Sequence, residues 1–189
     1  MNSQSFTNPT YAALRRRLAV GLCLVAVCAL QDVQAHGPTR QKVIESVDID
    51  APAEKVWALV GDFAEGWPKW HPAIEASSAD NGNTVGSQRR LTIKGGKFLV
   101  ERLDLYEPAT MTLKYVIRSG DALPVTNYSS MVTVRAEGSK THVEWRGAFY
   151  RGYPNNDPPP ELNDDAALTA VTGVYKTGLE NLKVVAEKH

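Results

Sequence analysis

The sequence predicts an α+β fold in which a curved antiparallel sheet of about seven strands is closed by one long C-terminal helix. Residues 74–150 contain six segments with strand-like patterns separated by short turns, which is typical of an antiparallel meander. Residues 164–186 follow, with apolar side chains at three- and four-residue steps, which predicts a helix roughly 35 Å long. A helix of this length spans a small sheet, so we expect it to pack across one face.

The chain before the meander supplies one more strand and two short helices. Gln41–Asp50 alternates apolar and polar side chains and predicts the first strand. Pro52 suits the first turn of a helix over Ala53–Val60, and a second short helix is expected over residues 63–72, interrupted at Pro68. The later strands are expected at residues 74–79, 84–94, 97–106, 110–118, 128–135 and 142–150.

A proline-rich segment joins the last strand to the long helix. Residues 153–160 read Tyr-Pro-Asn-Asn-Asp-Pro-Pro-Pro, a polyproline-like strut that fixes where the helix begins. Asn163 and the two aspartates after it supply an N-cap oxygen and negative charge to the first turn. Gly173 and Gly178 lower the helix propensity, which indicates either a close approach of helix to sheet or room for a ligand.

The N-terminal segment has the pattern of a secretory signal peptide. Arg15–Arg17 precede the apolar run Leu18–Leu30, and Val33-Gln34-Ala35 fits a small-residue cleavage site. The run is shorter than the roughly 20 residues of a membrane span, so cleavage after Ala35 is expected, with an uncleaved anchor as the alternative. Residues 1–35 are therefore predicted to be removed, which leaves one periplasmic domain, residues 36–189, without a membrane span.

Composition limits the function of this domain. Both cysteines, Cys23 and Cys28, lie in the predicted signal, so the domain has no disulfide and its stability must come from its core. Residues 36–189 contain 18 Lys and Arg against 20 Asp and Glu, a net charge of −2. Such a balance offers no basic field for nucleic acid, so no nucleic-acid partner is predicted.

No metal site and no cofactor are predicted. The histidines His36, His71, His142 and His189 are scattered, without thiols or a paired spacing. Oxygens in residues 155–157 and 163–165 would suit a hard cation, but no spacing matches a binding loop, and turn and capping roles suffice. Cleavage after Ala35 would make His36 the N-terminal residue, whose amine and imidazole could chelate Cu(II); a terminal residue without a role is the simpler alternative.

The hairpin around Gly95-Gly96 predicts a buried ion pair. A three-residue turn that includes both glycines pairs Leu91 with Leu99 and gathers the apolar side chains on one face. The same register sets Arg89 opposite Glu101, both pointing inward among leucines. Buried charges need partners, so we predict an Arg89–Glu101 pair; the alternative is that both reach solvent at the rim of a cavity.

Trp67, Trp70 and His71 form an aromatic cluster between prolines. Three interpretations remain open: a ligand gate, a partner-binding hot spot, or a plug that closes the open end of the sheet. His71 is disfavoured as a general base because no Asp, Ser or Cys adjoins it in a catalytic spacing.

Two sets of candidate site residues result from these patterns. The side chains expected to line a ligand cavity, although ordinary core packing would give the same alternation, are Arg89, Glu101, Leu91, Leu103, Tyr115, Tyr128, Trp145, Phe149 and Tyr175. The side chains expected at the cavity mouth or a partner surface are Trp67, Trp70, His71, Tyr153, Asn155, Asn156 and Asp157. No catalytic residue is predicted.

The element order and several motifs resemble the SRPBCC superfamily, the helix-grip proteins that include the START, Bet v 1-like and polyketide cyclase/dehydrase families. The resemblance covers Lys42–Glu187 and rests on residues 49–57 (IDAPAEKVW), residues 67–72 (WPKWHP) and the strands containing Gly86–Arg90 and Glu101–Leu103. It implies a sheet wrapped around the long helix with a hydrophobic cavity between them.

Three further segments are similar to the MxaD family of exported proteins encoded with methanol dehydrogenase systems. They are residues 36–39 (HGPT), 122–130 (ALPVTNYSS) and 147–163 (GAFYRGYPNNDPPPELN). This likeness implies a non-catalytic periplasmic accessory protein that aids the interaction of a quinoprotein methanol or alcohol dehydrogenase with its c-type cytochrome.

Two alternatives remain open. One is a carrier for a lipid or hydrophobic small molecule in the cavity. The other is a polyketide cyclase/dehydrase-like enzyme with Glu101, Arg89, His71 or a pocket tyrosine as acid or base. The lack of a recognisable nucleophile, metal set or cofactor motif disfavours the enzyme.

Overall fold

The computed structural model describes residues 37–188. The predictions of a signal peptide, of cleavage after Ala35 and of copper binding at His36 fall on residues outside this range. The strands are β1 (Gln41–Ile49), β2 (Ile74–Ala79), β3 (Gln88–Ile93), β4 (Phe98–Glu107), β5 (Thr112–Gly120), β6 (Val125–Glu137) and β7 (Lys140–Arg151). The helices are α2 (Ala53–Val60) and α3 (Asp164–Ala186), with 3-10 turns η2 (Trp67–Lys69), η3 (Pro108–Thr110) and η4 (Pro160–Leu162).

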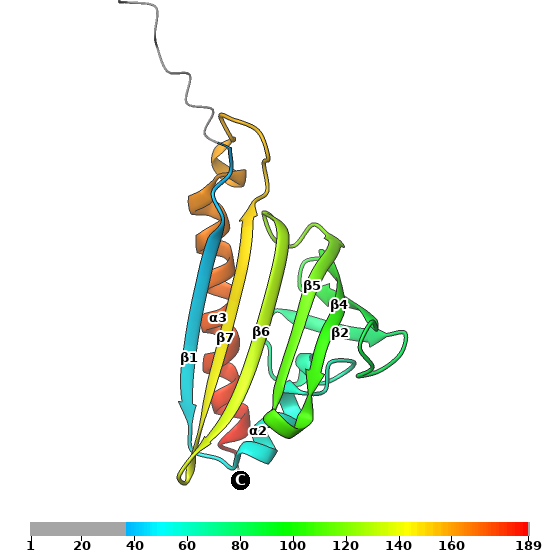
Figure 1. Cartoon of the computed structure of the whole chain (residues 1–189), viewed down its shortest axis with the longest axis vertical. Helices are drawn as coiled ribbons and strands as arrows, with labels where there is room; N and C mark the ends of the chain where they lie inside the picture. The colour runs from blue at the N-terminus through cyan, green and yellow to red at the C-terminus, as the bar shows by residue number, and fades with distance from the viewer. Residues whose placement is uncertain (1–36, 189) are drawn as a thin grey trace, which may run out of the picture. The chain divides into compact units, whose positions relative to one another are not determined.

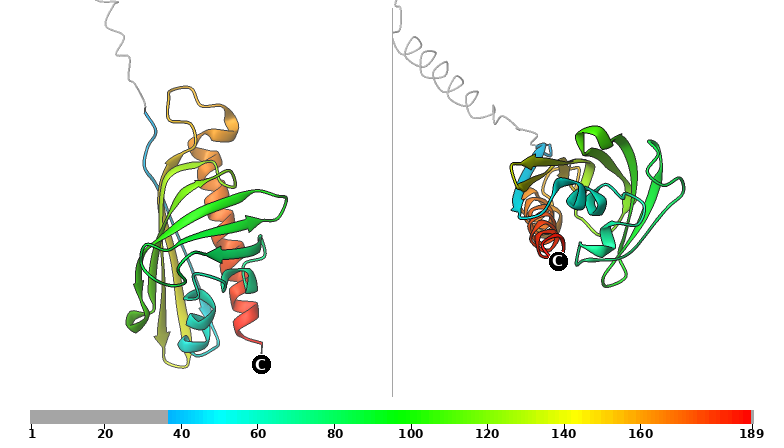
Figure 2. Two further views of the ribbon diagram at one scale, coloured as in Figure 1. Left: turned by 90° about the vertical axis from the view of Figure 1, so that its right-hand side faces the viewer. Right: turned by 90° about the horizontal axis from the view of Figure 1, so that it is seen from below.

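The seven strands form one antiparallel sheet in the order β1-β7-β6-β5-β4-β3-β2. Strands β2 to β7 make the predicted meander, and β1 returns to the edge beside β7 (Figure 1). The sheet curls around α3, which packs against β1 and β7, while α2 lies at one end (Figure 2). The predicted helix-grip arrangement is therefore confirmed.

Helix α3 has the bounds that its sequence predicts because its first turn is capped. The Asn163 side chain accepts a hydrogen bond from the Ala166 amide at 2.8 Å, and Asp164 and Asp165 add negative charge at the positive end of the helix dipole. The side chains and glycine that α3 buries against the sheet are Ala167, Val171, Tyr175, Gly178, Leu179, Leu182 and Ala186.

The β3–β4 hairpin has the predicted register. Leu91 pairs with Leu99 and Arg89 with Glu101. The turn between them needs left-handed backbone at both glycines, with φ of +88° at Gly95 and +85° at Gly96, a conformation that other residues rarely adopt. This turn is what places the charged pair on the inner face.

Three expected elements differ from the structure. The strand expected over residues 84–94 is shortened to β3, because residues 84–87 form a turn in which the Ser87 amide donates to the Thr84 carbonyl and Gly86 has a φ of +94°. The second short helix, expected over residues 63–72, is reduced to the 3-10 turn η2, because its prolines prevent a continuous α-helix. Strand β6 begins at Val125 rather than Tyr128, since Val125 and Thr126 pair with the end of β7 before a bulge at Asn127, where φ is +48°. Among the residues that the structure describes, no helix is long and apolar enough to cross a membrane.

Candidate ligand-binding cavity

The Arg89–Glu101 pair lies in the interior, between the sheet and η2. Arg89 Nε donates to Glu101 Oε2 at 2.7 Å, and the two residues expose 0% and 3% of their surface. The inward ion pair is therefore confirmed, and the alternative in which both groups reach solvent is wrong.

Aromatic rings hold the Arg89 guanidinium in place. Its central carbon lies 4.1 Å from the Phe63 ring centroid and 4.0 Å from that of Trp67, and Nη1 donates to the Phe63 carbonyl at 2.9 Å. Nη2 is buried and has no hydrogen-bond partner in the described structure. Stacking between rings suits a guanidinium, which is planar and weakly hydrated. No sequence pattern indicated a role for Phe63, because this residue belongs to a loop and precedes Arg89 by 26 residues.

Burial shifts the pKa of Glu101, a member of this pair, and that of His71, which lies nearby. Desolvation raises the pKa of Glu101, and the charge and hydrogen bond of Arg89 partly offset that rise. Burial lowers the pKa of His71 from 6.5 to about 4, although a hydrogen bond to Val174 opposes the change. His71 Nε2 lies 3.2 Å from the Val174 carbonyl, and Nδ1 accepts from the Ala73 amide at 3.3 Å. The imidazole is therefore neutral at pH 7, with its proton on Nε2.

An apolar cavity of about 70 Å³ lies beside these groups, between the sheet, η2 and α3. Its walls are formed by Trp67, His71, Ala73, Ile74, Leu91, Ile93, Leu99, Glu101, Tyr115, Ala122, Leu123, Tyr128, Trp145 and Val174. Ligand pockets usually measure roughly 300–1,000 Å³, so this one is small. At about 15 Å³ for each water, it has room for roughly five non-hydrogen atoms.

The predicted lining residues divide into two groups. Leu91, Glu101, Tyr115, Tyr128 and Trp145 line the cavity. The others, Arg89, Leu103, Phe149 and Tyr175, are buried but lie behind this wall. Sequence periodicity identified the inward face of each strand, but it did not predict the contributions of Ala122, Leu123 and Val174, which close the cavity from a loop and from the helix.

A buried network of hydroxyl groups supports the cavity wall. Tyr175 Oη lies 2.6 Å from Tyr128 Oη and 2.9 Å from Ser130 Oγ, and Trp145 Nε1 donates to Ser130 at 2.8 Å and to Tyr115 at 3.1 Å. Burial raises the pKa of all three tyrosines, so they remain neutral hydrogen-bonding groups. Ser130 joins the tyrosines to Trp145, a role that no sequence pattern indicated.

The Trp67, Trp70 and His71 cluster is part of the core and not a surface. The three residues expose 2%, 1% and 3% of their area. The indole groups donate inward, Trp67 to the Val60 carbonyl and Trp70 to the Leu59 carbonyl. The interpretation of this cluster as a partner-binding surface is therefore corrected: a partner cannot reach these rings, and their position fits a plug.

Gly178 explains how α3 reaches this plug. A Cβ atom at this position would lie 2.7 Å from the His71 ring and 3.0 Å from that of Trp145. The close-approach interpretation therefore holds for Gly178. At Gly173 a Cβ would meet nothing within 4 Å, so that glycine has no packing reason in the structure.

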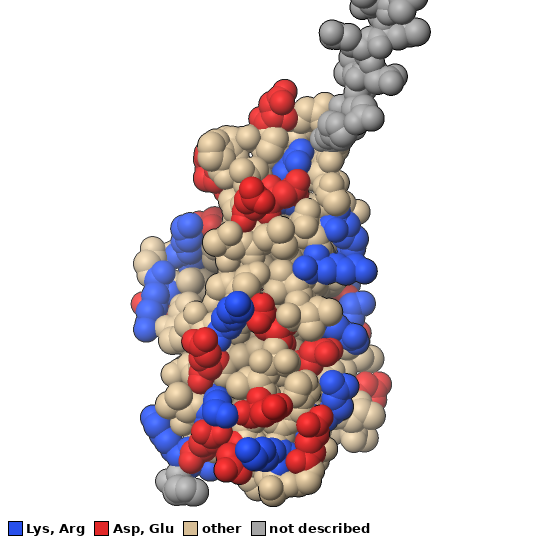
Figure 3. All heavy atoms as spheres, turned by 90° about the vertical axis from the view of Figure 1, so that its left-hand side faces the viewer, with Lys and Arg blue, Asp and Glu red and all other residues tan. Residues whose placement is uncertain are grey.

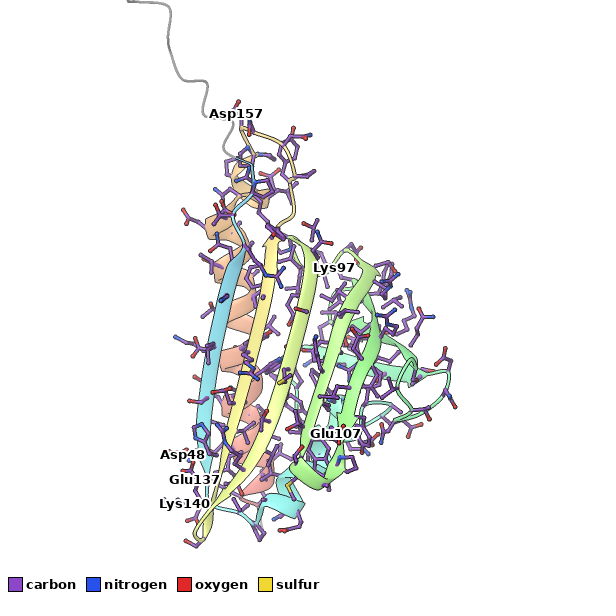
Figure 4. All side chains as sticks on the ribbon, in the orientation of Figure 1. Asp48, Lys97, Glu107, Glu137, Lys140 and Asp157 are labelled. Carbon is purple, nitrogen blue, oxygen red and sulfur yellow. The ribbon has the colours of Figure 1, made fainter. Side chains whose placement is uncertain are left out.

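The proline-rich strut lies far from the plug. Arg151 anchors it, with Nε donating to the Tyr153 carbonyl, Nη2 to the Asn155 carbonyl and Nη1 to Asp164 Oδ2, at 2.8–3.0 Å. The plug contacts α3 much further along the helix, where Asn181 Nδ2 donates to the Trp70 carbonyl. At 1.5 Å per residue, Asn181 lies about 26 Å along the helix from Asp164. The predicted mouth therefore divides into a buried cluster and an exposed strut, at whose tip Asp157 lies (Figure 4).

The structure also brings together one set of possible metal ligands that sequence spacing did not predict. Asp48 and Glu137 lie at the end of the sheet away from Asp157 (Figure 4). One ligand atom from each of these residues and one from His142 lie within 4.8 Å of one another. They come from three strands, and His142 Nδ1 already lies 2.7 Å from Asp48 Oδ1. The two carboxylates are solvent-exposed, and the contact between His142 and Asp48 accounts for the arrangement.

In this structure a curved sheet wraps around one long helix, and an apolar cavity lies between them. This arrangement defines the class of helix-grip ligand-binding proteins. Residues 40–187 match the family described as polyketide cyclase / dehydrase and lipid transport, and the chain belongs to this family.

Several known proteins are similar to this chain. MLP-like protein 423 of Arabidopsis thaliana is 28% identical over 129 residues, which cover 64% of this chain and 83% of the plant protein. The solved structure of XoxI from Bacillus cereus has 30% identity and a TM-score of 0.66, covering 78% of this chain and 99% of XoxI. A structure from Bacillus thuringiensis has 30% identity and a TM-score of 0.64, covering 78% and 100% of the two chains.

Proposed function

We propose that this protein binds a small, mainly apolar molecule in the cavity between the sheet and α3, without catalysing its conversion. The observation that carries the proposal is the composition of the cavity wall. Apolar and aromatic side chains form most of it, and one carboxyl group, that of Glu101, reaches it from the buried pair with Arg89. A few polar groups in an apolar wall are typical of sites that orient a small ligand.

The dimensions of the cavity restrict the ligand. About 70 Å³ accepts a molecule of roughly five non-hydrogen atoms, such as a short-chain alcohol, without rearrangement. A larger ligand needs the wall to move. Ala122 and Leu123 are half-buried in the β5–β6 loop, so this part of the wall can move without breaking strand pairing.

The protonation states support binding rather than acid–base chemistry. Within the described cavity wall, the titratable side chains are Glu101, His71, Tyr115 and Tyr128. Glu101 is paired with the opposite charge of Arg89. His71 is neutral at pH 7, and burial keeps both tyrosines protonated. Each already has a partner inside the protein, so none is left as an acid or base poised for a reaction.

A titration with 1-butanol, followed by amide chemical shifts, tests this proposal. Saturable shifts are expected around Leu99, Leu123 and Val174, because these side chains line the cavity. Val174→Phe fills the cavity and should abolish binding, whereas Val184→Phe on the exposed side of α3 is the matched control and should not. Saturable shifts confined to other parts of the sheet would contradict the proposal, as would unchanged binding by Val174→Phe.

A second function is favoured by one specific observation. The two longer segments that resemble the MxaD family lie side by side: Val125 pairs with Arg151 and Thr126 with Tyr150. The backbone of Gly152 also packs against that of Pro124. These segments therefore share one end of the domain, which supports a single docking surface for a quinoprotein methanol dehydrogenase or its c-type cytochrome in the periplasm.

Dehydrogenase-dependent reduction of the cytochrome, measured with and without this protein, tests the accessory role. The rate is expected to rise when the protein is added, and Tyr153→Ala with Asp157→Ala should remove the gain because both residues lie on the strut. Lys97→Ala, at the exposed β3–β4 turn, is the control. A rate that is unaffected by the wild-type protein would rule out the accessory role while leaving ligand binding intact.

A further inference from the structure

The outer face of the sheet carries a groove of about 320 Å³, larger than the interior cavity and within the range of ligand sites. Helix α3 lies behind β1 and β7 in Figure 1, so that view looks onto this outer face. The groove crosses four neighbouring strands, and its lining residues are Lys42, Ile44, Lys114, Ser129, Ser130, Met131, Arg146, Gly147 and Ala148.

Strand register explains why the surface is hollowed here. Ala148 pairs with Ser129 on one side, which sets two small side chains next to each other, and with Lys42 at the edge strand on the other. The next row contains Arg146 and Met131, whose side chains are long. Small residues beside long ones leave a depression in a face where side chains stand perpendicular to the sheet.

The groove is positively charged. Lys42, Lys114 and Arg146 line it, and no carboxylate does. Within residues 37–188, neither lysine forms an ion pair, and Arg146 Nη1 lies 3.9 Å from its nearest carboxylate, that of Glu144. By contrast, Lys and Arg are interspersed with Asp and Glu on the neighbouring face, seen in Figure 3.

Apolar surface accompanies this charge. Ile44 is 62% exposed, the most exposed large hydrophobic residue in the described chain. Met131 lies across the groove, where its Sδ is 2.9 Å from Arg146 Nη2. The three strand intervals from β1 to β5 amount to roughly 14 Å, which two lysine side chains can bridge from opposite sides toward one bound group.

We propose that this groove binds a small organic anion with a short apolar tail, whose carboxylate or phosphate head lies between Lys42, Lys114 and Arg146. Ile44 and Met131 then contact the tail, and Ser129 and Ala148 form the floor. This site is separate from the interior cavity, because the groove opens on the opposite face of the sheet.

Hexanoate is the probe that tests the proposal, with hexanol as the uncharged match and inorganic phosphate as the head group alone. In an amide chemical-shift titration of the purified protein, hexanoate should shift Ser129, Gly147 and Ala148 with a Kd on the order of 1 mM at low salt. The affinity for hexanoate should fall as ionic strength rises, because salt screens the exposed charge pairs between its carboxylate and the basic side chains of the groove. Hexanol should leave these amides unshifted, and phosphate should bind more weakly than hexanoate.

Three variants separate the site from a general charge effect. Lys42→Gln with Lys114→Gln should weaken hexanoate binding by roughly five-fold, and Ala148→Leu should block it by filling the floor. Lys97→Gln removes one lysine charge at the exposed β3–β4 turn and should change nothing. The proposal is overturned if hexanoate shifts Leu123 and Val174 instead, if hexanol or phosphate binds equally well, or if the double variant binds as tightly as the wild type.

Discussion

Replacing Glu101 by Gln should destabilise the fold by about 3 kcal/mol. Removing one member of a buried ion pair usually costs about 3–5 kcal/mol, because the remaining charge is left without compensation. The lower end is expected here, since Arg89 keeps its hydrogen bond to the Phe63 carbonyl and its stacking on Phe63 and Trp67. Urea unfolding followed by tryptophan fluorescence measures this change.

The double variant Arg89→Met/Glu101→Leu separates the charge from the packing. Replacing both partners by apolar side chains of similar volume is often neutral or stabilising, so the double variant should lie within about 1 kcal/mol of the wild type. It should be more stable than Glu101→Gln alone. With the single variants Arg89→Met and Glu101→Leu, the four free energies of unfolding give the coupling between the two side chains.

The pH dependence of Arg89→Met adds a check with a definite sign. Desolvation already raises the pKa of Glu101 above 4.5, and losing the arginine removes the interaction that opposes the rise. The folded state then binds a proton more tightly than the unfolded state. The stability of Arg89→Met, measured relative to the double variant, is therefore greatest below pH 4.5. This advantage is lost as the pH rises through the raised pKa of Glu101. A pH-independent difference, or a Glu101→Gln variant within about 0.5 kcal/mol of the wild type, would show that the charges of this pair do not contribute to stability as expected.

Three further predictions concern the surrounding core. Because burial lowers the pKa of His71 from 6.5 to about 4, this residue contributes roughly 3 kcal/mol of stability above pH 6.5, which is lost as the pH falls through 4. In His71→Gln, the free energy of urea unfolding should therefore depend less on pH over this range. Gly147→Ala would place a Cβ against Tyr175 Oη and should cost about 1–3 kcal/mol, which Tyr175→Phe should partly relieve. Asn163→Ala removes the cap to the Ala166 amide and should lower the thermal midpoint, at a cost of about 1 kcal/mol; an unchanged midpoint would mean that the cap contributes nothing.

Features with a local cause could be predicted from the sequence. The bounds of α3 follow from its cap at Asn163, and the β3–β4 register follows from Gly95 and Gly96. Arg89 and Glu101 face each other because that register places them so. In each case a short stretch of chain determines the geometry.

Features that depend on packing between distant segments could not be predicted. The proline-flanked pattern of Trp67 and Trp70 does not show on which side of the sheet the rings lie, and the expected surface is part of the core. The size of the cavity is the space left after these rings pack against Trp145, whose ring centroid is 5.2 Å from that of Trp67 and 5.9 Å from that of Trp70. Side-chain periodicity contains no information about the volume that remains after distant side chains have packed together.

Intermolecular nuclear Overhauser effects between 1-butanol and the protein would show directly whether the interior cavity binds a small alcohol. We expect contacts from the alcohol to the methyl groups of Leu99, Leu123 and Val174, which line the interior cavity. These contacts should disappear in Val174→Phe. Contacts only to exposed side chains such as Val85 or Val184 would contradict the account, because they would mean that the cavity does not admit even a ligand of its own size.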